Sequence, residues 1–219
     1  MNVENLGWNN SFAAAFTAYT GKHYDVGRIS AEHKTLYEVI TTQGTMPAIV
    51  SGKFLHTAQT PGEFPAVGDW VVLTINEAEQ KAIIHGILPR KSRFSRTAAG
   101  DTPQEQVIAA NVDTLFIVSS LNREFNVRRI ERYITMAWES GADPVIVLTK
   151  ADLCEDINGC IQAVEQVAWG IPIHVVSAIS GEGIDELQPY FREGNTVVVL
   201  GSSGVGKSSL INALVKDAD

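Results

Sequence analysis

One stretch near the C-terminal end of the chain has the residue types and spacing of a phosphate-binding loop. Residues 196–200 are mostly β-branched and predict a buried parallel strand, residues 201–208 follow the pattern Gly-x-x-x-x-Gly-Lys-Ser, and residues 210–214 begin a helical pattern. A strand before and a helix after are the context that such a loop requires, and a chance glycine-rich match would not be expected to have both. We therefore predict that the phosphates of a nucleotide bind Gly201, Ser202, Ser203, Gly204, Val205, Gly206, Lys207, Ser208 and Ser209.

The residue types in this loop indicate what each one would do. Gly201 and Gly206 allow backbone angles that turn successive N–H groups inward, and the following helix adds the positive end of its dipole. Lys207 would reach the β- and γ-phosphates, and the Ser208 hydroxyl would be a ligand of Mg²⁺. Both residues are predicted to be catalytic, because they would hold the charge of the transferred phosphoryl group.

A second candidate segment, residues 149–152, directly follows the apolar run 145–148. A carboxylate here could accept two hydrogen bonds from guanine, whereas adenine lacks the exocyclic amine and presents an acceptor in place of N1–H. Such a site rejects adenine because the carboxylate would be left unpaired. Alone, a Lys–Asp pair that opens a loop is an ordinary surface feature. The segment predicts guanine contacts from Thr149, Lys150, Ala151 and Asp152, with the Lys150 stem along the base or ribose.

A third segment, Ser177–Ala178, follows the strand-like residues 171–176. A turn of small residues lets backbone N–H groups approach the guanine carbonyl oxygen, so both residues are predicted to bind guanine. The three motifs together favour a guanine-nucleotide pocket. The alternative is a phosphate-loop ATPase in which Asp152 does not read the base, and competition between ATP and GDP would separate the two.

The second half of the chain alternates strand and helix patterns, which predicts the parallel sheet that these motifs need. Strand-like runs cover residues 112–121, 145–148 and 171–176, and helical patterns cover 127–137, 157–168 and 184–191. Asn126 is expected to cap the first of these helices and Gly141 to stop it. Such a sheet is covered on both faces, and ligands gather at the carboxyl ends of its strands.

The first half has an all-β pattern that predicts a five-stranded barrel of the OB type. Its candidate strands are residues 26–29, 36–41, 48–52, 70–75 and 82–88. Residues 11–19 predict a short amphipathic helix packed on this domain, with Asn10 or Ser11 as its N-cap. OB-type barrels often bind RNA through one face, and a barrel that serves only as a spacer is the alternative.

A cationic run follows the barrel: Arg90, Lys91, Arg93 and Arg96, with Phe94 between them. These four residues are weak candidates for RNA contacts, and a solvated edge is the other interpretation. Residues 97–111 are expected to be a linker that includes a short helical turn. The predicted domains are therefore 1–96 for the N-terminal helix and barrel, and 112–219 for the α/β domain.

Composition narrows the class of protein further. The 219 residues carry a net charge of −8, which argues against a chain that coats nucleic acid with its whole surface. Cys154 and Cys160 are too few for a disulfide scaffold and fit no zinc spacing. No apolar run reaches membrane-spanning length, and the N-terminus lacks a secretory signal, so we expect a cytoplasmic protein without a membrane partner.

The order of the motifs carries a specific resemblance. Base-reading segments come before the phosphate loop, the reverse of the order in most GTPases. The chain resembles the circularly permuted GTPases of the RsgA type over nearly its whole length, through residues 64–70, 88–90, 110–113, 149–152 and 201–209. The resemblance implies an OB domain that contacts rRNA, a GTPase that uses GTP, GDP and Mg²⁺, and a role for a monomer in late assembly of the bacterial small ribosomal subunit.

The resemblance also has two departures. Thr149 stands where many GTPases have Asn, and a hydroxyl can make only part of the network of that amide. The family's switch threonine, Asp-x-x-Gly motif and zinc ligands are not found; the one internal match, residues 156–159, follows a loop rather than a buried strand. We therefore expect an incomplete GTPase domain from a longer protein whose Zn²⁺ binds outside this chain. The alternative is a module that binds GDP or GTP and RNA with little turnover.

Overall fold

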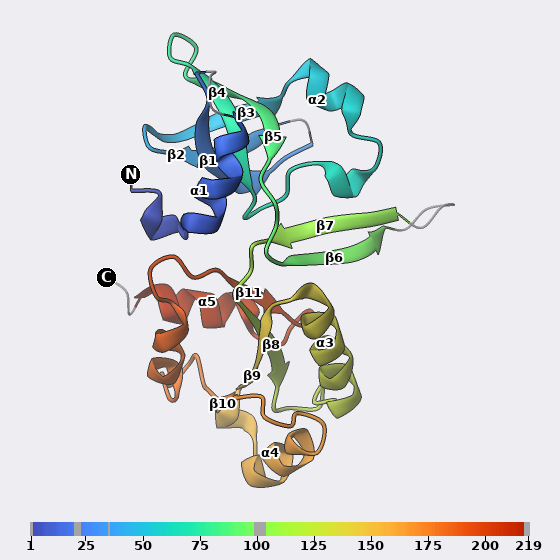
Figure 1. Ribbon diagram of the computed structural model, residues 1–219. Helices are drawn as coiled ribbons and strands as arrows, with labels where there is room; N and C mark the ends of the chain where they lie inside the picture. Colours follow the sequence, from blue (N-terminus) through green and yellow to red (C-terminus); the bar gives the residue numbers. More distant parts are fainter. Residues whose placement is uncertain (1, 20–22, 35, 99–103, 217–219) are drawn as a thin grey trace. The chain divides into compact units, whose positions relative to one another are not determined.

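A computed structural model describes residues 2–19, 23–34, 36–98 and 104–216 (Figure 1). The chain divides into two compact units, Met1–Val112 and Asp113–Asp219. We refer to them as the barrel unit and the sheet unit. None of the helices in the described residues is long and apolar enough to cross a membrane.

The barrel unit contains a closed barrel of five strands in the order β1-β2-β3-β5-β4. Four of the five pairings are antiparallel, and the parallel pairing of β3 with β5 closes the barrel. Alternate residues point inward and build the core around Ile29, Val39, Leu73 and Ile84, all of them buried. The predicted five-stranded barrel is confirmed, with strands β1 (Asp25–Glu32), β2 (Tyr37–Thr41), β3 (Gly44–Val50), β4 (Trp70–Asn76) and β5 (Lys81–Ile87).

Helix α1 (Asn10–Phe16) packs on the barrel through aromatic side chains, as predicted. The Phe12 ring of α1 lies 5.9 Å from the Trp70 ring, and the Trp8 ring, just before the helix, lies 4.9 Å from Trp70 in an edge-to-face arrangement. The predicted N-cap is wrong by one residue: the side chain of Asn9 accepts hydrogen bonds from the amides of Ser11 and Phe12. The remaining short helices of this unit are η1 (Glu4–Leu6), η2 (Thr17–Tyr19), α2 (Gly52–Thr57) and η3 (Pro61–Glu63).

The predicted linker is a β-hairpin over its described part. Strand β6 (Arg93–Ala98) pairs antiparallel with β7 (Gln104–Ala110), so the helical turn expected there is wrong. The Ala110 amide donates to the Val67 carbonyl at 2.8 Å, which joins the hairpin to the barrel within the barrel unit. Val107 and Ala109 are buried while Ile108 between them is exposed, the alternation of a strand with one covered face. Residues 99–103 of the predicted linker lie outside the described residues.

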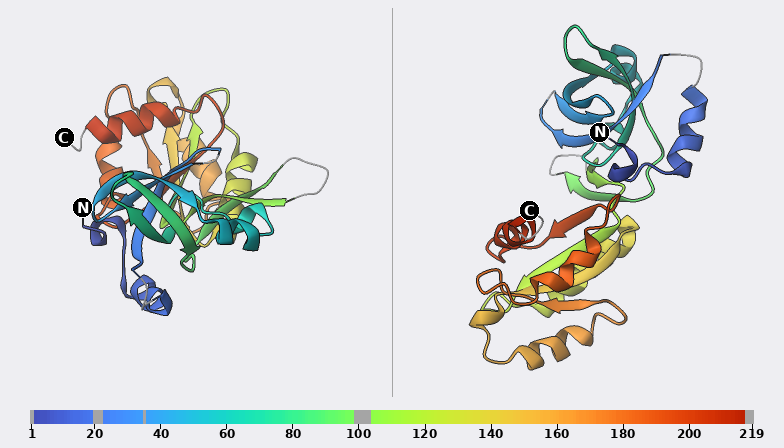
Figure 2. Two further views of the ribbon diagram at one scale, coloured as in Figure 1. Left: turned by 90° about the horizontal axis from the view of Figure 1, so that it is seen from above. Right: turned by 90° about the vertical axis from the view of Figure 1, so that its left-hand side faces the viewer.

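The sheet unit is built on four parallel strands in the order β10-β9-β8-β11, which confirms the predicted parallel α/β architecture. Helices α3 and α5 lie on opposite faces of this sheet (Figures 1 and 2). Phe116, Val118 and Val147 pack with Leu210 and Leu214 of α5 on one face. The strands are β8 (Thr114–Ser120), β9 (Asp143–Thr149), β10 (Ile173–Val175) and β11 (Val197–Leu200), and the helices are α3 (Val127–Ser140), η4 (Ala151–Leu153), α4 (Ile157–Glu165), η5 (Ile184–Tyr190) and α5 (Lys207–Lys216).

Local signals locate α3 well. The Asn126 side chain accepts a hydrogen bond from the Arg129 amide, and Gly141 ends the helix with a φ of 80°, both as predicted. The helix predicted over 184–191 is instead the 3-10 helix η5, which contains Pro189 and ends at Tyr190. A proline inside an α-helix removes a backbone hydrogen bond, so the tighter helix is the form this segment can take.

Candidate nucleotide-binding site

The phosphate loop connects β11 to α5, as the sequence predicts. Gly204 and Gly206 have φ values of 81° and 96°, the left-handed region that favours glycine. Gly201 has no such angle, so the conformational role predicted for it is wrong; a Cβ there would lie 2.5 Å from the Val118 carbonyl oxygen. Gly201 is therefore needed for the close approach of the loop to β8. Val205 is buried in the core beneath the loop and anchors it.

The Lys207 ammonium group lies over its own loop. It donates hydrogen bonds to the carbonyl oxygens of Gly201 and Ser202 at 2.8 and 2.7 Å. Ser208 and Ser209 are exposed in the first turn of α5, where backbone N–H groups have no helical partner and the helix dipole is positive. A phosphate group at this position would meet an ammonium group, a hydroxyl and backbone donors together.

The predicted guanine-binding segment at the end of β9 contacts the predicted phosphate loop directly. Thr149 is buried, and its hydroxyl donates to the Val205 carbonyl at 2.6 Å. Lys150 has a φ of 60°, and its ammonium group donates to the Gly204 carbonyl at 2.7 Å. The two contacts hold adjacent residues of one predicted motif against adjacent residues of another.

Asp152 and Ser177, predicted to lie together, are in contact. The buried Ser177 hydroxyl donates to Asp152 Oδ1 at 2.6 Å, and the Ala151 amide donates to the Val176 carbonyl at 3.2 Å. Asp152 itself is exposed in η4, so its carboxylate is held in one orientation and remains accessible. Ala178 is partly exposed beside it. This arrangement can present a carboxylate edge to two donors of a planar base.

The strand order explains why these segments meet. The strands β9, β10 and β11 are all parallel to β8, so their carboxyl ends lie at one edge of the sheet. The chemistry of the donor set there suits Mg²⁺ held by one hydroxyl and by phosphate oxygens. In the described part of the chain, no group of three His, Cys, Asp or Glu side chains lies together to hold a metal ion.

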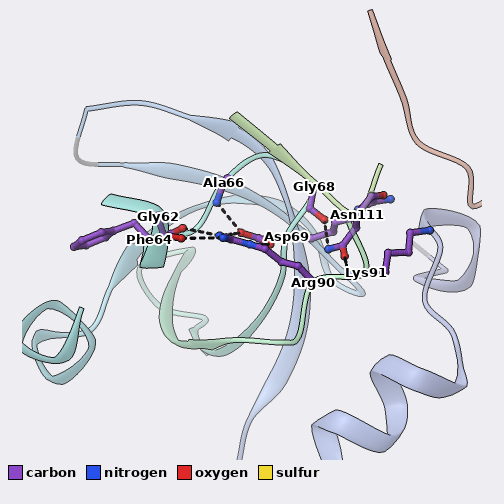
Figure 3. A network of polar contacts seen from close by, with 9 residues as sticks. Gly62, Phe64, Ala66, Gly68, Asp69, Arg90, Lys91 and Asn111 are labelled. Atoms are coloured by element: carbon purple, nitrogen blue, oxygen red, sulfur yellow. Dashed lines mark hydrogen bonds and ion pairs between the residues drawn. The ribbon is translucent and has the colours of Figure 1, made fainter. Parts of the chain in front are cut away.

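The predicted RNA contacts fall into two groups. Arg90 is taken up inside the barrel unit: its guanidinium binds both carboxylate oxygens of the fully buried Asp69 at 2.8 and 2.7 Å, and it donates to the carbonyls of Gly62 and Phe64 (Figure 3). The guanidinium N–H groups of Arg90 are bound within the fold, so the RNA contact predicted for Arg90 is not proposed again. Sequence reasoning missed this pair, since nothing in the run 90–96 marks its first cation as different.

The other three cations of the run are exposed. Arg93 lies 3.4 Å from Glu105 across the hairpin, and Arg96 donates to the Gln106 side chain at 3.2 Å. The Lys91 amide donates to the Asn111 side chain, which in turn donates to the Gly68 carbonyl (Figure 3). The exposed contacts of Arg93 with Glu105 and of Arg96 with Gln106 are weak, so water or a phosphate group can replace Glu105 and Gln106 as partners.

Comparison with known proteins agrees with this geometry. A family model described as RsgA GTPase matches residues 87–219. The chain is 48% identical over 215 residues to the small ribosomal subunit biogenesis GTPase RsgA 2 of Lactiplantibacillus plantarum, covering 98% of this chain and 60% of that relative's length.

Two solved structures resemble this chain in fold. The structure of YjeQ from Thermotoga maritima matches with a TM-score of 0.70 and 27% identity, over 87% of this chain and 65% of that one. That of YloQ, titled a circularly permuted GTPase, matches with a TM-score of 0.66 and 25% identity, over 91% of this chain and 67% of that one. The permuted motif order, the barrel followed by the parallel sheet and the family model all lead to one assignment: this chain belongs to the RsgA GTPase family.

Proposed function

We propose that this chain binds GTP and GDP with Mg²⁺ and contributes to GTP hydrolysis during assembly of the small ribosomal subunit. The observation that carries the nucleotide part is the pair of contacts from Thr149 and Lys150 to the phosphate loop. A base-reading segment that touches the phosphate loop is what one nucleotide bound across both would require.

In this proposal each motif has a separate task. The backbone N–H groups of residues 201–206 and the start of α5 bind the phosphates, and Lys207 exchanges its loop carbonyls for phosphate oxygens. Ser208 would hold Mg²⁺ through its hydroxyl, and the ion would supply charge neutralisation at the transferred phosphoryl group. Asp152 selects guanine, and Ser177 orients its carboxylate; Lys150 and Ala178 cover the base.

The ribosomal part rests on the relatives. Several of them carry the name small ribosomal subunit biogenesis GTPase RsgA, and this chain spans 60% of the length of the first. We propose that the barrel unit and the hairpin cations Arg93 and Arg96 contact rRNA, and that the sheet unit binds the nucleotide. We further propose a cytoplasmic monomer, which the two free thiols Cys154 and Cys160 support.

The decisive experiment is displacement of a fluorescent GDP analogue from this chain by unlabelled GDP and by ATP. Displacement by GDP alone is expected, because Asp152 would leave its carboxylate unpaired against adenine. Equal displacement by ATP would overturn the guanine assignment. Phosphate release from GTP, with and without isolated small ribosomal subunits, then separates a turning-over enzyme from a module that only binds.

A further inference from the structure

Both cysteines of the chain, Cys154 and Cys160, lie together beside the predicted guanine-binding segment. The sequence contains no other cysteine, and both side chains are partly exposed. The Cys160 thiol forms a hydrogen bond with the Cys154 sulfur, so the two sulfur atoms are neighbours. Two accessible thiols in contact can be joined by a disulfide bond, which a single cysteine cannot form.

The connection between η4 and α4 brings the two thiols together. Cys154 ends η4 with an extended backbone. Two residues later the Asp156 side chain caps α4 by accepting a hydrogen bond from the Gly159 amide at 2.9 Å. The Cys160 amide donates to the Asp156 carbonyl at 3.3 Å, which holds Cys160 in the first turn of α4. The backbone of this short connection therefore sets the position of one thiol relative to the other.

The first of these cysteines is also tied to the residue proposed to read guanine. The Cys154 amide donates to the Ala151 carbonyl at 3.1 Å, and the Leu153 amide donates to the Lys150 carbonyl at 3.0 Å. These bonds form the single turn η4, which carries Asp152. A displacement of Cys154 therefore acts on Asp152 through two residues of backbone.

We propose that Cys154 and Cys160 are a site of reversible oxidation, at which a disulfide bond lowers the affinity of the chain for guanine nucleotides. The inference rests on the proposed guanine site and assigns a regulation to it. Disulfides of cytoplasmic proteins are usually transient and redox-sensing, which suits a pair of exposed thiols more than a structural bond.

The geometry indicates which element has to move. Hydrogen-bonded sulfur atoms are not yet bonded, and a disulfide brings them to about 2.05 Å. Helix α4 is nine residues long and is anchored by the fully buried Val164, whereas η4 is one turn. The displacement therefore falls on Cys154, stretches its bond to the Ala151 carbonyl and moves Asp152 from the position that suits the base.

Cys154 is the attacking thiol and Cys160 the resolving one. Burial raises the pKa of the Cys160 thiol, with further contributions from Cys154 and Asp156. Cys160 therefore keeps its proton and donates it in the hydrogen bond to Cys154, which supports a thiolate on the Cys154 sulfur.

The oxidant belongs to the class of small disulfides, of which oxidised glutathione is the probe. The Cys154 thiolate attacks one glutathione sulfur, the glutathione disulfide bond breaks, and one glutathione leaves as a thiolate that takes up the proton lost by Cys154. The Cys160 thiolate then attacks the Cys154 sulfur, and the second glutathione leaves and takes up the proton lost by Cys160. The protein loses two electrons and the glutathione disulfide gains them.

The test is equilibration of the full chain in buffers with graded ratios of reduced and oxidised glutathione. Intact mass scores the disulfide as the loss of two hydrogen atoms, and a fluorescent GDP analogue measures binding. The oxidised chain should bind GDP about 5- to 150-fold more weakly than the reduced chain. Dithiothreitol should restore both the mass and the affinity.

Linkage supplies a second readout that a merely structural disulfide would not move. If oxidation weakens GDP binding, GDP must favour the dithiol by the same factor. Saturating GDP should therefore raise the reduction potential of the pair by about 30 mV for each tenfold loss of affinity. The shift is measured as the change in the glutathione ratio at which half of the chain is oxidised.

Serine variants separate the two thiols. Cys160→Ser lacks the resolving thiol, so it should accumulate a mixed disulfide with glutathione on Cys154. Cys154→Ser should accumulate much less of this adduct. The matched control, Cys154→Ser/Cys160→Ser, should bind GDP like the reduced parent chain at every glutathione ratio.

Two outcomes would overturn the proposal: no intramolecular disulfide in the parent chain at any ratio, or equal GDP affinity of its oxidised and reduced forms. The comparison uses one protein in two redox states, so misfolding of a variant cannot imitate the result. Absent GDP binding by the reduced chain would refute the proposed function, and the coupling with it. The intact mass would still decide whether the disulfide forms.

Discussion

The hydroxyl of Thr149, at the end of β9, donates a hydrogen bond of 2.6 Å to the carbonyl oxygen of Val205 in the phosphate loop. The same hydroxyl lies 3.4 Å from the Ser119 carbonyl. A hydroxyl has one proton to donate, so the shorter contact takes it. The Thr149 hydroxyl therefore ties the end of β9 to the phosphate loop.

Replacing Thr149 by Val should weaken GDP binding about 5- to 30-fold. The variant keeps the shape of the side chain but leaves the Val205 carbonyl without its donor, a cost of about 1–2 kcal/mol. Titration with a fluorescent GDP analogue measures the effect. Thr149→Ser retains the hydroxyl and should bind nearly as well as the parent chain; equal losses in both variants would assign the effect to packing.

Asp152→Asn should lower GDP affinity at least about 100-fold and favour xanthosine diphosphate. Guanine presents two donors to this position, and the amide would oppose one of them with a donor of its own. Xanthine has a carbonyl oxygen in place of the amine, which the amide N–H can bind. Competition between the two diphosphates measures the change, and undiminished GDP affinity would remove Asp152 from base recognition.

Lys207→Ala should reduce GTP turnover at least about 100-fold, since the variant removes the cation that would stabilise the transferred phosphoryl group. The carbonyls of Gly201 and Ser202 lose their partner but are only partly buried, so water can replace the ammonium group. Phosphate release measures turnover, and Lys53→Ala serves as the control. Normal turnover in Lys207→Ala would place the catalytic cation elsewhere.

Asp69→Asn should destabilise the barrel unit by about 3–5 kcal/mol. The change leaves the Arg90 guanidinium as an uncompensated buried charge, and it weakens the bond from the Ala66 amide (Figure 3). Urea unfolding, monitored by tryptophan fluorescence, gives the free energy. Glu105→Gln breaks the exposed ion pair with Arg93 and should cost less than about 1 kcal/mol. Similar costs for the two variants would contradict the structural role of Asp69.

The barrel unit should lose stability in alkali through Tyr37. Burial, with smaller contributions from Glu32 and Asp69, raises the pKa of Tyr37 from its usual 10.0 to about 12. A raised pKa in the folded state means that the stabilisation is complete below pH 10 and is lost as the pH rises to about 12. Unfolding free energies across this range should fall less steeply in Tyr37→Phe. An identical pH dependence in both proteins would exclude Tyr37 as the group responsible.

Much of the sheet unit could be predicted because its signals are local. A β-branched run next to Gly-x-x-x-x-Gly-Lys-Ser specifies strand, loop and helix within residues 196–214, and Asn126 and Gly141 mark the ends of α3. The hairpin β6–β7 was not predictable in the same way. Most of β6 and the first half of β7 are polar, and β7 also forms a bridge to residue 67, which is 42 residues away along the chain from Ala109.

The sequence by itself determined the family, the order of the motifs and the chemistry of each candidate residue, because those depend on residue type and spacing. Only the tertiary structure decided which residues touch. Strand order brings Thr149 to Val205, 56 residues away, and barrel closure brings Arg90 to Asp69. The fate of a charged side chain depends on partners that are distant along the chain. The sequence therefore presents Arg90 and Arg93 as one cationic run, whereas the fold buries the first as a structural ion and leaves the second in solvent.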